Sequence, residues 1–148
     1  MIIGIGTDII EIARVAKAWE RKGQRFVCRI CSPKEAELFA AMQSDRSCSK
    51  AQLERMAARF ACKEAVMKAL GTGWRHGVAW NEIEILHRPS GQPYVNLLGR
   101  TKEISREKGI VEIQVSMSHD NERAVAFAIA LGEIGGVKSG VDFTGVPE

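Results

Sequence analysis

The sequence predicts an α+β fold in which helices pack against a mainly antiparallel sheet. Two alternating stretches, residues 111–118 and 123–131, are joined by a short polar link, which is typical of an antiparallel hairpin. Residues 49–71 are rich in helix formers, lack proline and end at a glycine, so they predict one long helix. The 148 residues are 45% hydrophobic and 26% charged, a composition that fits a single globular domain.

The N-terminal segment predicts a strand followed by a helix. Residues 1–7 alternate β-branched and small residues, and Gly4 and Gly6 would let another backbone approach this strand closely. Asp8 stands at the end of the strand, where a carboxylate can cap the next helix or bind a metal, and the pattern alone favours neither. A helix is then expected over residues 9–22. Its core-facing side would carry Ile9, Ile12, Val15 and Trp19.

Capping and turn residues predict the other elements. The segment 32–35 is a capping box with proline at the first helical position, so a helix should begin there and run to about residue 42. Residues 82–86 and 94–98 alternate as strands on either side of a turn that contains Pro89, Gly91 and Pro93. A short helix over residues 98–108 should end at Gly109.

The ends of the chain and its cysteines predict a cytoplasmic protein. No secretory signal stands at the N-terminus, and no stretch reaches the roughly 18 apolar residues that a membrane helix needs. Cys28 and Cys31 form half of a zinc site, but no second close pair follows, so the four cysteines predict free thiols. The glycine-rich residues 133–148 predict a flexible tail after a single domain, residues 1–132.

The predicted long helix carries an unusual set of charges beside its apolar stripe. The stripe consists of Leu53, Met56, Phe60 and Met67. Lys63 and Glu64 flank it, and charges so close to a buried stripe need partners. Glu64 could simply pair with Lys68 one turn later. However, Arg59, Lys63 and Lys68 around one carboxylate, followed by Gly71-Thr72-Gly73, also suit a phosphate-rich ligand with a divalent metal.

The preceding segment is strongly basic. Residues 14–29 hold Arg14, Lys17, Arg21, Lys22, Arg25 and Arg29 against a single acid, Glu20. Phe26 is predicted to be exposed among these cations. Such a face suits an acidic protein partner, although the net charge of the whole chain is only +3.

Two motifs also resemble those of a known family. The segment Arg59-Phe60-Ala61-Cys62-Lys63-Glu64-Ala65, continued by Lys68-Ala69-Leu70-Gly71-Thr72-Gly73, lies more than 50 residues after Gly4-Ile5-Gly6-Thr7-Asp8. In order and spacing the two resemble the motifs of holo-(acyl-carrier-protein) synthases, the small bacterial 4'-phosphopantetheinyl transferases. The resemblance implies the fold of that superfamily and transfer of phosphopantetheine from coenzyme A to a serine of apo acyl carrier protein, for fatty acid biosynthesis.

The resemblance also implies roles for individual residues. Asp8 and Glu64 would hold Mg²⁺, and Glu64 and Lys68 would be catalytic, with Lys68 supporting the leaving group. The proton acceptor stays open between Glu64 and the less favoured Glu35. The coenzyme would be bound by Arg59, Lys63, Gly71, Thr72, Gly73, Gly91, Pro93, Ser118 and His119.

Partners follow from the same resemblance. The acidic carrier protein would dock on Arg14, Arg21, Arg25, Phe26 and Arg29. Family members of this length are trimers with sites between subunits, so a homotrimer is expected, with neither nucleic acid nor membrane as a partner. Two alternatives remain: a non-catalytic basic module that binds nucleotide or an acidic protein, and a Mg²⁺-dependent phosphate-ester hydrolase.

Overall fold

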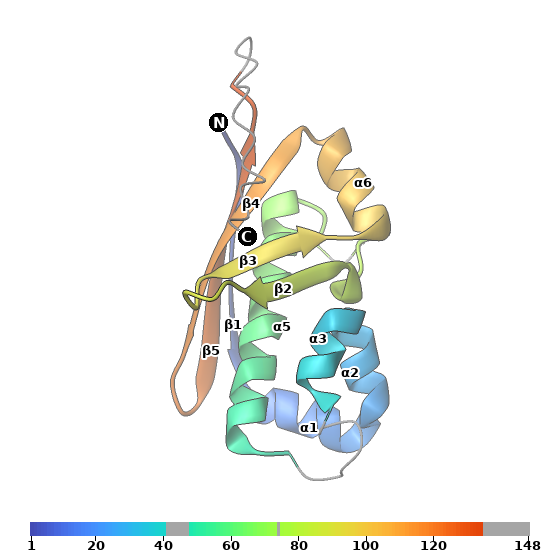
Figure 1. The fold of residues 1–148 in the computed structure, drawn as a ribbon, viewed down its shortest axis with the longest axis vertical. Coiled ribbons are helices and arrows are strands. Elements are labelled where there is room, and N and C mark those ends of the chain that lie inside the picture. The colour runs from blue at the N-terminus through green and yellow to red at the C-terminus, as the bar shows by residue number, and fades with distance from the viewer. Residues whose placement is uncertain (41–47, 74, 135–148) are drawn as a thin grey trace.

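The long helix α5 (Lys50–Leu70) lies at the centre of the fold, between a three-stranded sheet and a two-stranded hairpin (Figure 1). The computed structural model describes residues 1–40, 48–73 and 75–134. The other elements, in chain order, are β1 (Ile2–Glu11), α1 (Ile12–Lys22), α2 (Gln24–Ile30), α3 (Pro33–Leu38), the 3-10 turn η1 (Trp80–Glu82), β2 (Ile83–His87), β3 (Pro93–Leu97), α6 (Gly99–Glu107), β4 (Ile110–His119) and β5 (Arg123–Gly132).

The three-stranded sheet is antiparallel, with β5 between β1 and β4. The inner face of β5 consists of alanines that are at most 1% exposed, at positions 124, 126, 128 and 130. Because these side chains are small, α5 can lie close to the sheet. The contact with β1 is closer still: a Cβ placed on Gly4 would lie 2.0 Å from the carbonyl oxygen of Ala69, and one on Gly6 would lie 1.9 Å from that of Ala65. The predicted close backbone packing of this strand is confirmed.

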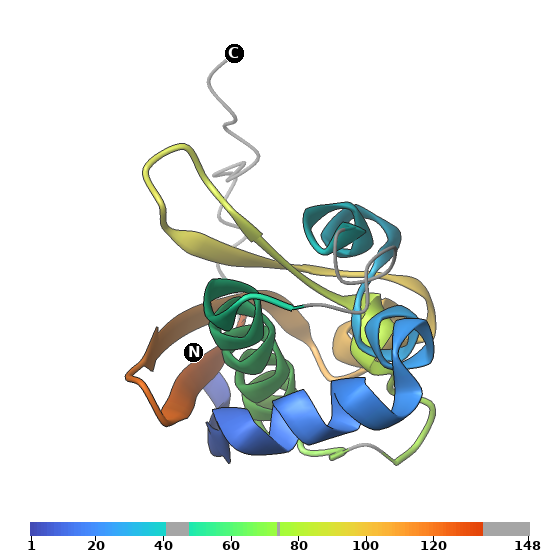
Figure 2. The same ribbon diagram turned by 90° about the horizontal axis from the view of Figure 1, so that it is seen from below.

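The hairpin of β2 and β3 covers another side of α5, and the helices α1, α2 and α3 form a lobe beside its N-terminal half (Figure 2). One cluster of buried side chains joins α5, the sheet, β2 and α6. A second joins α5 to the helical lobe and includes Val15, Val27, Phe39 and Met56. Since α5 takes part in both, most of its length is buried and few of its charged side chains can avoid a protein partner.

Local signals predicted the start of α3 and both ends of α5. Ser32 and Glu35 make the expected capping box at α3, and Ser49 makes a second one with Gln52 at α5. Gly71 ends α5 with a positive φ of 74°, a backbone conformation that glycine adopts without a steric penalty. The two hairpins and the predicted α+β class are also confirmed.

The N-terminal boundary differs from the prediction. β1 continues to Glu11, so Asp8 lies within the strand and α1 begins only at Ile12. Pairing of residues 8–11 with β5 outweighs their helical pattern. Consequently Asp8 does not cap a helix, and Ile9, predicted to face the core, is 63% exposed on the outer face of the sheet.

Further along the chain, α2 follows α1 directly, although no helix had been predicted over residues 24–30. The helix expected to run to about residue 42 ends at Leu38, with Phe39 as its C-cap. Most of the expected tail, from residue 135 on, lies outside the described residues. Of the helices in the described ranges, none is both long and apolar enough to cross a membrane.

Candidate active site

The close contact of β1 with α5 brings together two parts of the chain that are far apart in sequence. Gly4, Gly6 and Asp8 alternate with exposed residues along β1 and face α5. Lys68 of α5 reaches this strand, and its Nζ donates to the carbonyl oxygen of Thr7 at 2.8 Å and to Oδ1 of Asp8 at 3.2 Å. The ion pair partner of Lys68 is therefore Asp8, rather than Glu64 one turn away on the same helix.

The carboxylate of Glu64 lies beside this ion pair and is about half buried. Burial raises the pKa of Glu64; a hydrogen bond from Trp80 opposes this shift, and the negative charge of Asp8 adds to it. In that hydrogen bond the indole Nε1 of Trp80 donates to Oε1 of Glu64 at 3.0 Å. Because Lys68 pairs with Asp8 and Glu64 precedes Lys68 by one helical turn, both carboxylates belong to the contact of β1 with α5.

The donor atoms of this acidic pair fit a divalent cation. Asp8 uses Oδ1 for Lys68 and Glu64 uses Oε1 for Trp80, which leaves the second oxygen of each without a hydrogen bond among the described residues. Carboxylate oxygens are the ligands that Mg²⁺ prefers, usually one or two of them together with water and substrate phosphate. No cluster of three or more His, Cys, Asp or Glu side chains occurs in the described ranges. The pair would thus bind an ion together with its substrate.

Lys63 does not have the predicted role of neutralising phosphate. Its side chain is fully buried, and its Nζ donates to Oε1 of Glu35 at 2.6 Å and to the carbonyl oxygens of Trp80 and Ile83 at 2.9 and 2.5 Å. An ammonium group has three protons, and all three are used in these bonds. The sequence showed that Lys63 needs a partner, but could not show that Glu35 of α3 supplies it.

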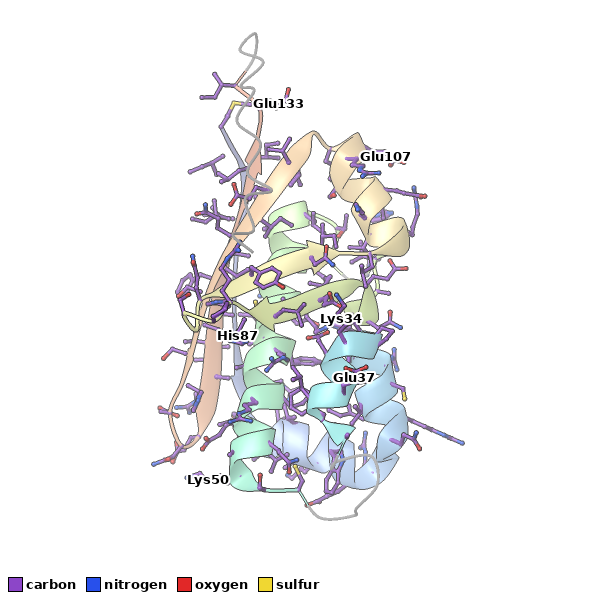
Figure 3. All side chains as sticks on the ribbon, in the orientation of Figure 1. Lys34, Glu37, Lys50, His87, Glu107 and Glu133 are labelled. Atoms are coloured by element: carbon purple, nitrogen blue, oxygen red, sulfur yellow. The ribbon has the colours of Figure 1, made fainter. Side chains whose placement is uncertain are left out.

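Arg59 belongs to the same buried group. It is 5% exposed, its guanidinium lies over the ring of Phe39, and its Nε is 3.6 Å from Oε2 of Glu35. The outer Nη2 lies 3.5 Å from Nδ1 of His87, at the end of β2 (Figure 3). Burial lowers the pKa of Arg59, against the attraction of Glu35. In this structure Arg59 packs under the β2–β3 hairpin, and its predicted contact with coenzyme phosphate stays a prediction.

The predicted docking residues divide by the face of their helix. Arg14 and Arg21 of α1 and Arg25 and Arg29 of α2 are all exposed. Phe26, by contrast, is 7% exposed and packs in the core of the helical lobe, so the prediction that it lies exposed on the docking face is wrong. The error arises because the helix α2 was not recognised: helical periodicity turns residue 26 inward and residues 25 and 29 outward.

Apart from Arg59 and Lys63, the predicted coenzyme residues lie at three separate places, of which Ser118 and His119 form the third. Gly71, Thr72 and Gly73 follow the C-terminal end of α5, where the hydroxyl of Thr72 donates to the carbonyl oxygen of Gly73 at 3.0 Å. Gly91 and Pro93 shape the turn between β2 and β3, in which Gly91 has a φ of 87° and its N–H bonds to the carbonyl oxygen of Arg88. Turn formation is confirmed, whereas contact with the coenzyme is untested.

Ser118 and His119 lie apart from the acidic pair. Nδ1 of His119 is 3.8 Å from Oε2 of Glu54, which precedes Glu64 by ten residues, or on the order of 15 Å along a helix. Ser118 pairs with Val125 of β5, which pairs with the exposed Ile9, on the face of the sheet that points away from α5. Within one chain, these two residues therefore do not reach the carboxylates.

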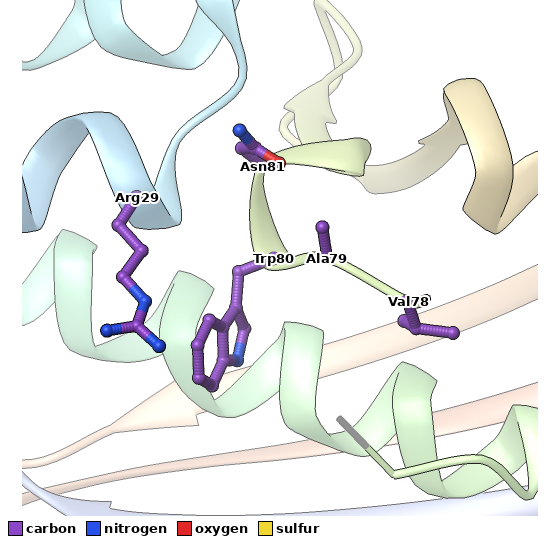
Figure 4. A pocket seen from close by; sticks show the side chains of 5 residues that line it. All are labelled: Arg29, Val78, Ala79, Trp80 and Asn81. Atoms are coloured by element: carbon purple, nitrogen blue, oxygen red, sulfur yellow. The ribbon is translucent and has the colours of Figure 1, made fainter. Parts of the chain in front are cut away.

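A surface hollow of about 310 Å³ contains Ser118 and His119. Its other lining residues are Ile9, Asp120, Arg123, Ala124 and Val125. Arg123 adds a cation that the sequence reading had not selected, because a lone arginine after a polar turn gives no signal of its own. A second hollow of about 320 Å³ is lined by Arg29, Val78, Ala79, Trp80 and Asn81 (Figure 4). Trp80 was likewise not selected, although it contacts Glu64.

All four cysteines are free, as predicted. Cys62 is fully buried, and burial raises the pKa of its thiol to about 12. Because the thiolate is the reactive form, this cysteine is protected in the folded protein, even though it adjoins Lys63 and Glu64.

Comparison with known proteins identifies the family. The model of the 4'-phosphopantetheinyl transferase superfamily matches residues 4–128. A holo-(acyl-carrier-protein) synthase of Desulforudis audaxviator is 42% identical over 132 residues, which cover 89% of this chain and 95% of the relative. The crystal structure of the synthase from Neisseria meningitidis has a TM-score of 0.78 at 34% identity, covering 88% of this chain and 99% of that one. The synthase of Helicobacter pylori, solved in complex with coenzyme A, has a TM-score of 0.69 at 30% identity and covers 86% and 99%.

The fold and the paired carboxylates thus belong to a class of enzymes that transfer phosphate-linked groups. The chain is a member of the 4'-phosphopantetheinyl transferase superfamily, within its holo-(acyl-carrier-protein) synthase family. The predictions of this family, of its fold and of an enzyme are confirmed.

Proposed function

We propose that this chain transfers the 4'-phosphopantetheine group of coenzyme A to a serine of apo acyl carrier protein, which releases adenosine 3',5'-bisphosphate. The observation that carries the proposal is the ion pair of Asp8 with Lys68 at the contact of β1 with α5, one helical turn after Glu64. The relatives' names support the reaction, and the Helicobacter pylori synthase was solved with coenzyme A. Family membership favours this reaction over a non-catalytic binding module and over a phosphate-ester hydrolase.

In this reaction the serine oxygen forms a bond to the phosphorus next to pantetheine. The bond from that phosphorus to the bridging oxygen of the diphosphate breaks, and the bridging oxygen leaves with adenosine 3',5'-bisphosphate. Asp8 and Glu64 would hold Mg²⁺, which supplies charge neutralisation at the diphosphate when bound. The side chain of Lys68 is 52% exposed and its ammonium group is bonded to β1, so this group can turn from Asp8 toward negative charge on the leaving group. The serine proton has to pass to a base, for which Glu64 is the better candidate, because Glu35 is fully buried and bonded to Lys63.

The exposed arginines of α1 and α2 form the proposed docking face for the acidic carrier protein. Arg29 adjoins the hollow that Trp80 lines, so this face extends toward the acidic pair (Figure 4). Charges of this kind mainly raise the association rate and orient the partner. Higher salt should therefore raise the KM for the carrier protein, and Arg25→Glu should do the same with little effect on kcat.

The exposed outer face of the sheet supports a homotrimer. Ile5 pairs with Ile129, and Thr7 with Phe127, and three of these four residues are apolar side chains that are 38–71% exposed. Neighbouring apolar residues on an exposed sheet face are typical of a protein interface. Within one chain Ser118 and His119 are separated from the acidic pair, so they can share a site with it only across a subunit interface. In such a trimer these two residues of one subunit would meet the acidic pair of another. We further propose a cytoplasmic enzyme whose single domain spans residues 1–132.

The proposal is tested by incubating the protein with coenzyme A, Mg²⁺ and apo acyl carrier protein and weighing the carrier by mass spectrometry. The carrier should gain the mass of one phosphopantetheine group, and chelation of Mg²⁺ should prevent the gain. Asp8→Ala and Glu64→Ala should abolish transfer while remaining folded, whereas the exposed Lys50→Ala should be fully active. Normal Mg²⁺-dependent turnover by either acidic variant would overturn the metal assignment.

A further inference from the structure

Two consecutive residues of α5 hydrogen-bond to Trp80, one to its backbone and one to its side chain. Its carbonyl oxygen accepts a hydrogen bond from Nζ of Lys63 at 2.9 Å, and its indole Nε1 donates to Oε1 of Glu64 at 3.0 Å. Lys63 is itself fixed by the fully buried carboxylate of Glu35. A short chain of bonds therefore runs from α3 through α5 to the turn η1, and returns to α5 at Glu64.

The indole ring is also fixed from the side. The ring of Phe60 stacks on it with centroids 6.0 Å apart and planes 26° from parallel. The guanidinium of Arg29 lies 5.2 Å from the ring centroid, a cation–π distance (Figure 4). An aromatic side chain with these contacts and a bonded backbone keeps one rotamer, so its N–H group stays in one place relative to α5.

We propose that Trp80 is a positioning residue for the acidic pair: its N–H group fixes Oε1 of Glu64, so that the other carboxylate oxygen is directed toward Asp8. Glu64 has a flexible side chain, and among the described residues its carboxylate takes its hydrogen bond from Trp80. Hydrogen-bond partners of metal ligands orient the ligand, and their removal typically costs 10- to 100-fold in metal affinity or activity. The inference rests on the proposed magnesium site.

The role proposed for Trp80 in the metal site can be tested apart from the role proposed for Arg29 in docking the carrier protein. Arg29 contacts the face of the ring through its charge, while the bond to Glu64 uses the ring nitrogen. Loss of the N–H group should thus affect the metal, whereas loss of the guanidinium should affect the carrier protein.

The decisive variant is Trp80→Phe, which keeps an apolar ring beside Phe60 and Arg29 but has no N–H group. Mg²⁺ binding in the presence of coenzyme A is measured by isothermal titration calorimetry, and the KM for carrier protein is measured at saturating Mg²⁺. We expect Trp80→Phe to weaken Mg²⁺ binding about 10-fold with an unchanged KM for the carrier. The control Phe60→Leu removes the stacked ring but leaves the N–H group and the bonded backbone of Trp80, and should weaken Mg²⁺ binding clearly less than Trp80→Phe does.

Two results would overturn the inference. One is wild-type Mg²⁺ affinity in folded Trp80→Phe, and the other is an equal loss in Phe60→Leu, which would indicate packing rather than the hydrogen bond. Thermal unfolding followed by circular dichroism verifies that both variants are folded. If the wild-type protein itself shows no Mg²⁺ dependence, the proposed metal site is wrong. If the wild type binds Mg²⁺ and Trp80→Phe binds it equally well, only the role of Trp80 is wrong.

Discussion

Replacing Lys63 with methionine should destabilise the protein strongly while leaving its affinity for coenzyme A unchanged. The substitution removes a charge that is 2.6 Å from Glu35, with both side chains fully buried. Breaking such a pair from one side typically costs about 3–5 kcal/mol, because the remaining charge is left buried without its partner. Arg59, whose Nε is 3.6 Å from Glu35, compensates only in part. We therefore expect about 3–5 kcal/mol less free energy of unfolding, a large part of the total for a domain of this size.

Urea denaturation measures this loss, and two further variants separate its causes. Lys50→Ala removes a lysine that is 65% exposed at the start of α5, and it should cost less than about 1 kcal/mol (Figure 3). The double variant Glu35→Gln with Lys63→Met removes both charges but keeps a residue that can complete the capping box with Ser32. It should regain only part of the loss, because the buried Arg59 then lacks its carboxylate partner and the carbonyl oxygens of Trp80 and Ile83 still lack the Lys63 donor. A Lys63→Met variant as stable as Lys50→Ala, or one with a strongly raised KM for coenzyme A, would refute the buried-pair reasoning.

Three other predictions follow from the fold. Gly6→Ala would place a Cβ 1.9 Å from the carbonyl oxygen of Ala65, so α5 must move away from β1. We expect the free energy of unfolding in urea to fall by about 1–3 kcal/mol, and kcat to fall by a larger fraction. Unchanged activity would argue against the close contact. Iodoacetamide at pH 8 should label the exposed Cys28 quickly. It should label Cys62 only after unfolding, because burial raises the pKa of that thiol to about 12; peptide mass spectrometry measures both rates. Phe127→Asp should convert the proposed trimer to monomers in light scattering, since Phe127 is 56% exposed on the outer sheet face; an unchanged mass would remove that face from the interface.

The sequence predicted those features that depend on neighbouring residues. Capping boxes, glycine C-caps and alternating strands are local, and so the start of α3, both ends of α5 and the β4–β5 hairpin followed from them. Where tertiary contacts decide, the prediction failed. Residues 8–11 have a helical pattern but pair with β5, and this pairing could not be inferred from either segment alone.

The candidate site shows the same division. Asp8, Glu64 and Lys68 were selected from two motifs, and the structure pairs Asp8 with Lys68, which follows Glu64 by one helical turn. The residue pattern alone could not distinguish Lys63, whose ammonium protons all bond within the protein, from Lys68, whose side chain is half exposed only five residues later. That distinction depends on which side of α5 faces α3, which is a property of the packed molecule. The same holds for Trp80, whose indole bond to Glu64 joins residues 16 positions apart.

The contact of Gly4 and Gly6 with the carbonyl groups of α5 has a consequence for how this enzyme can vary. It sets the spacing between strand and helix by main-chain atoms, so repacking of the core side chains would leave Asp8 at the same depth. Insertion or deletion of a single residue between Gly6 and Asp8 is different, because successive side chains of a strand point to opposite faces. Such a change would send the carboxylate to the outer surface beside Ile5 and Ile9, and would leave Glu64 alone at the edge of its helix.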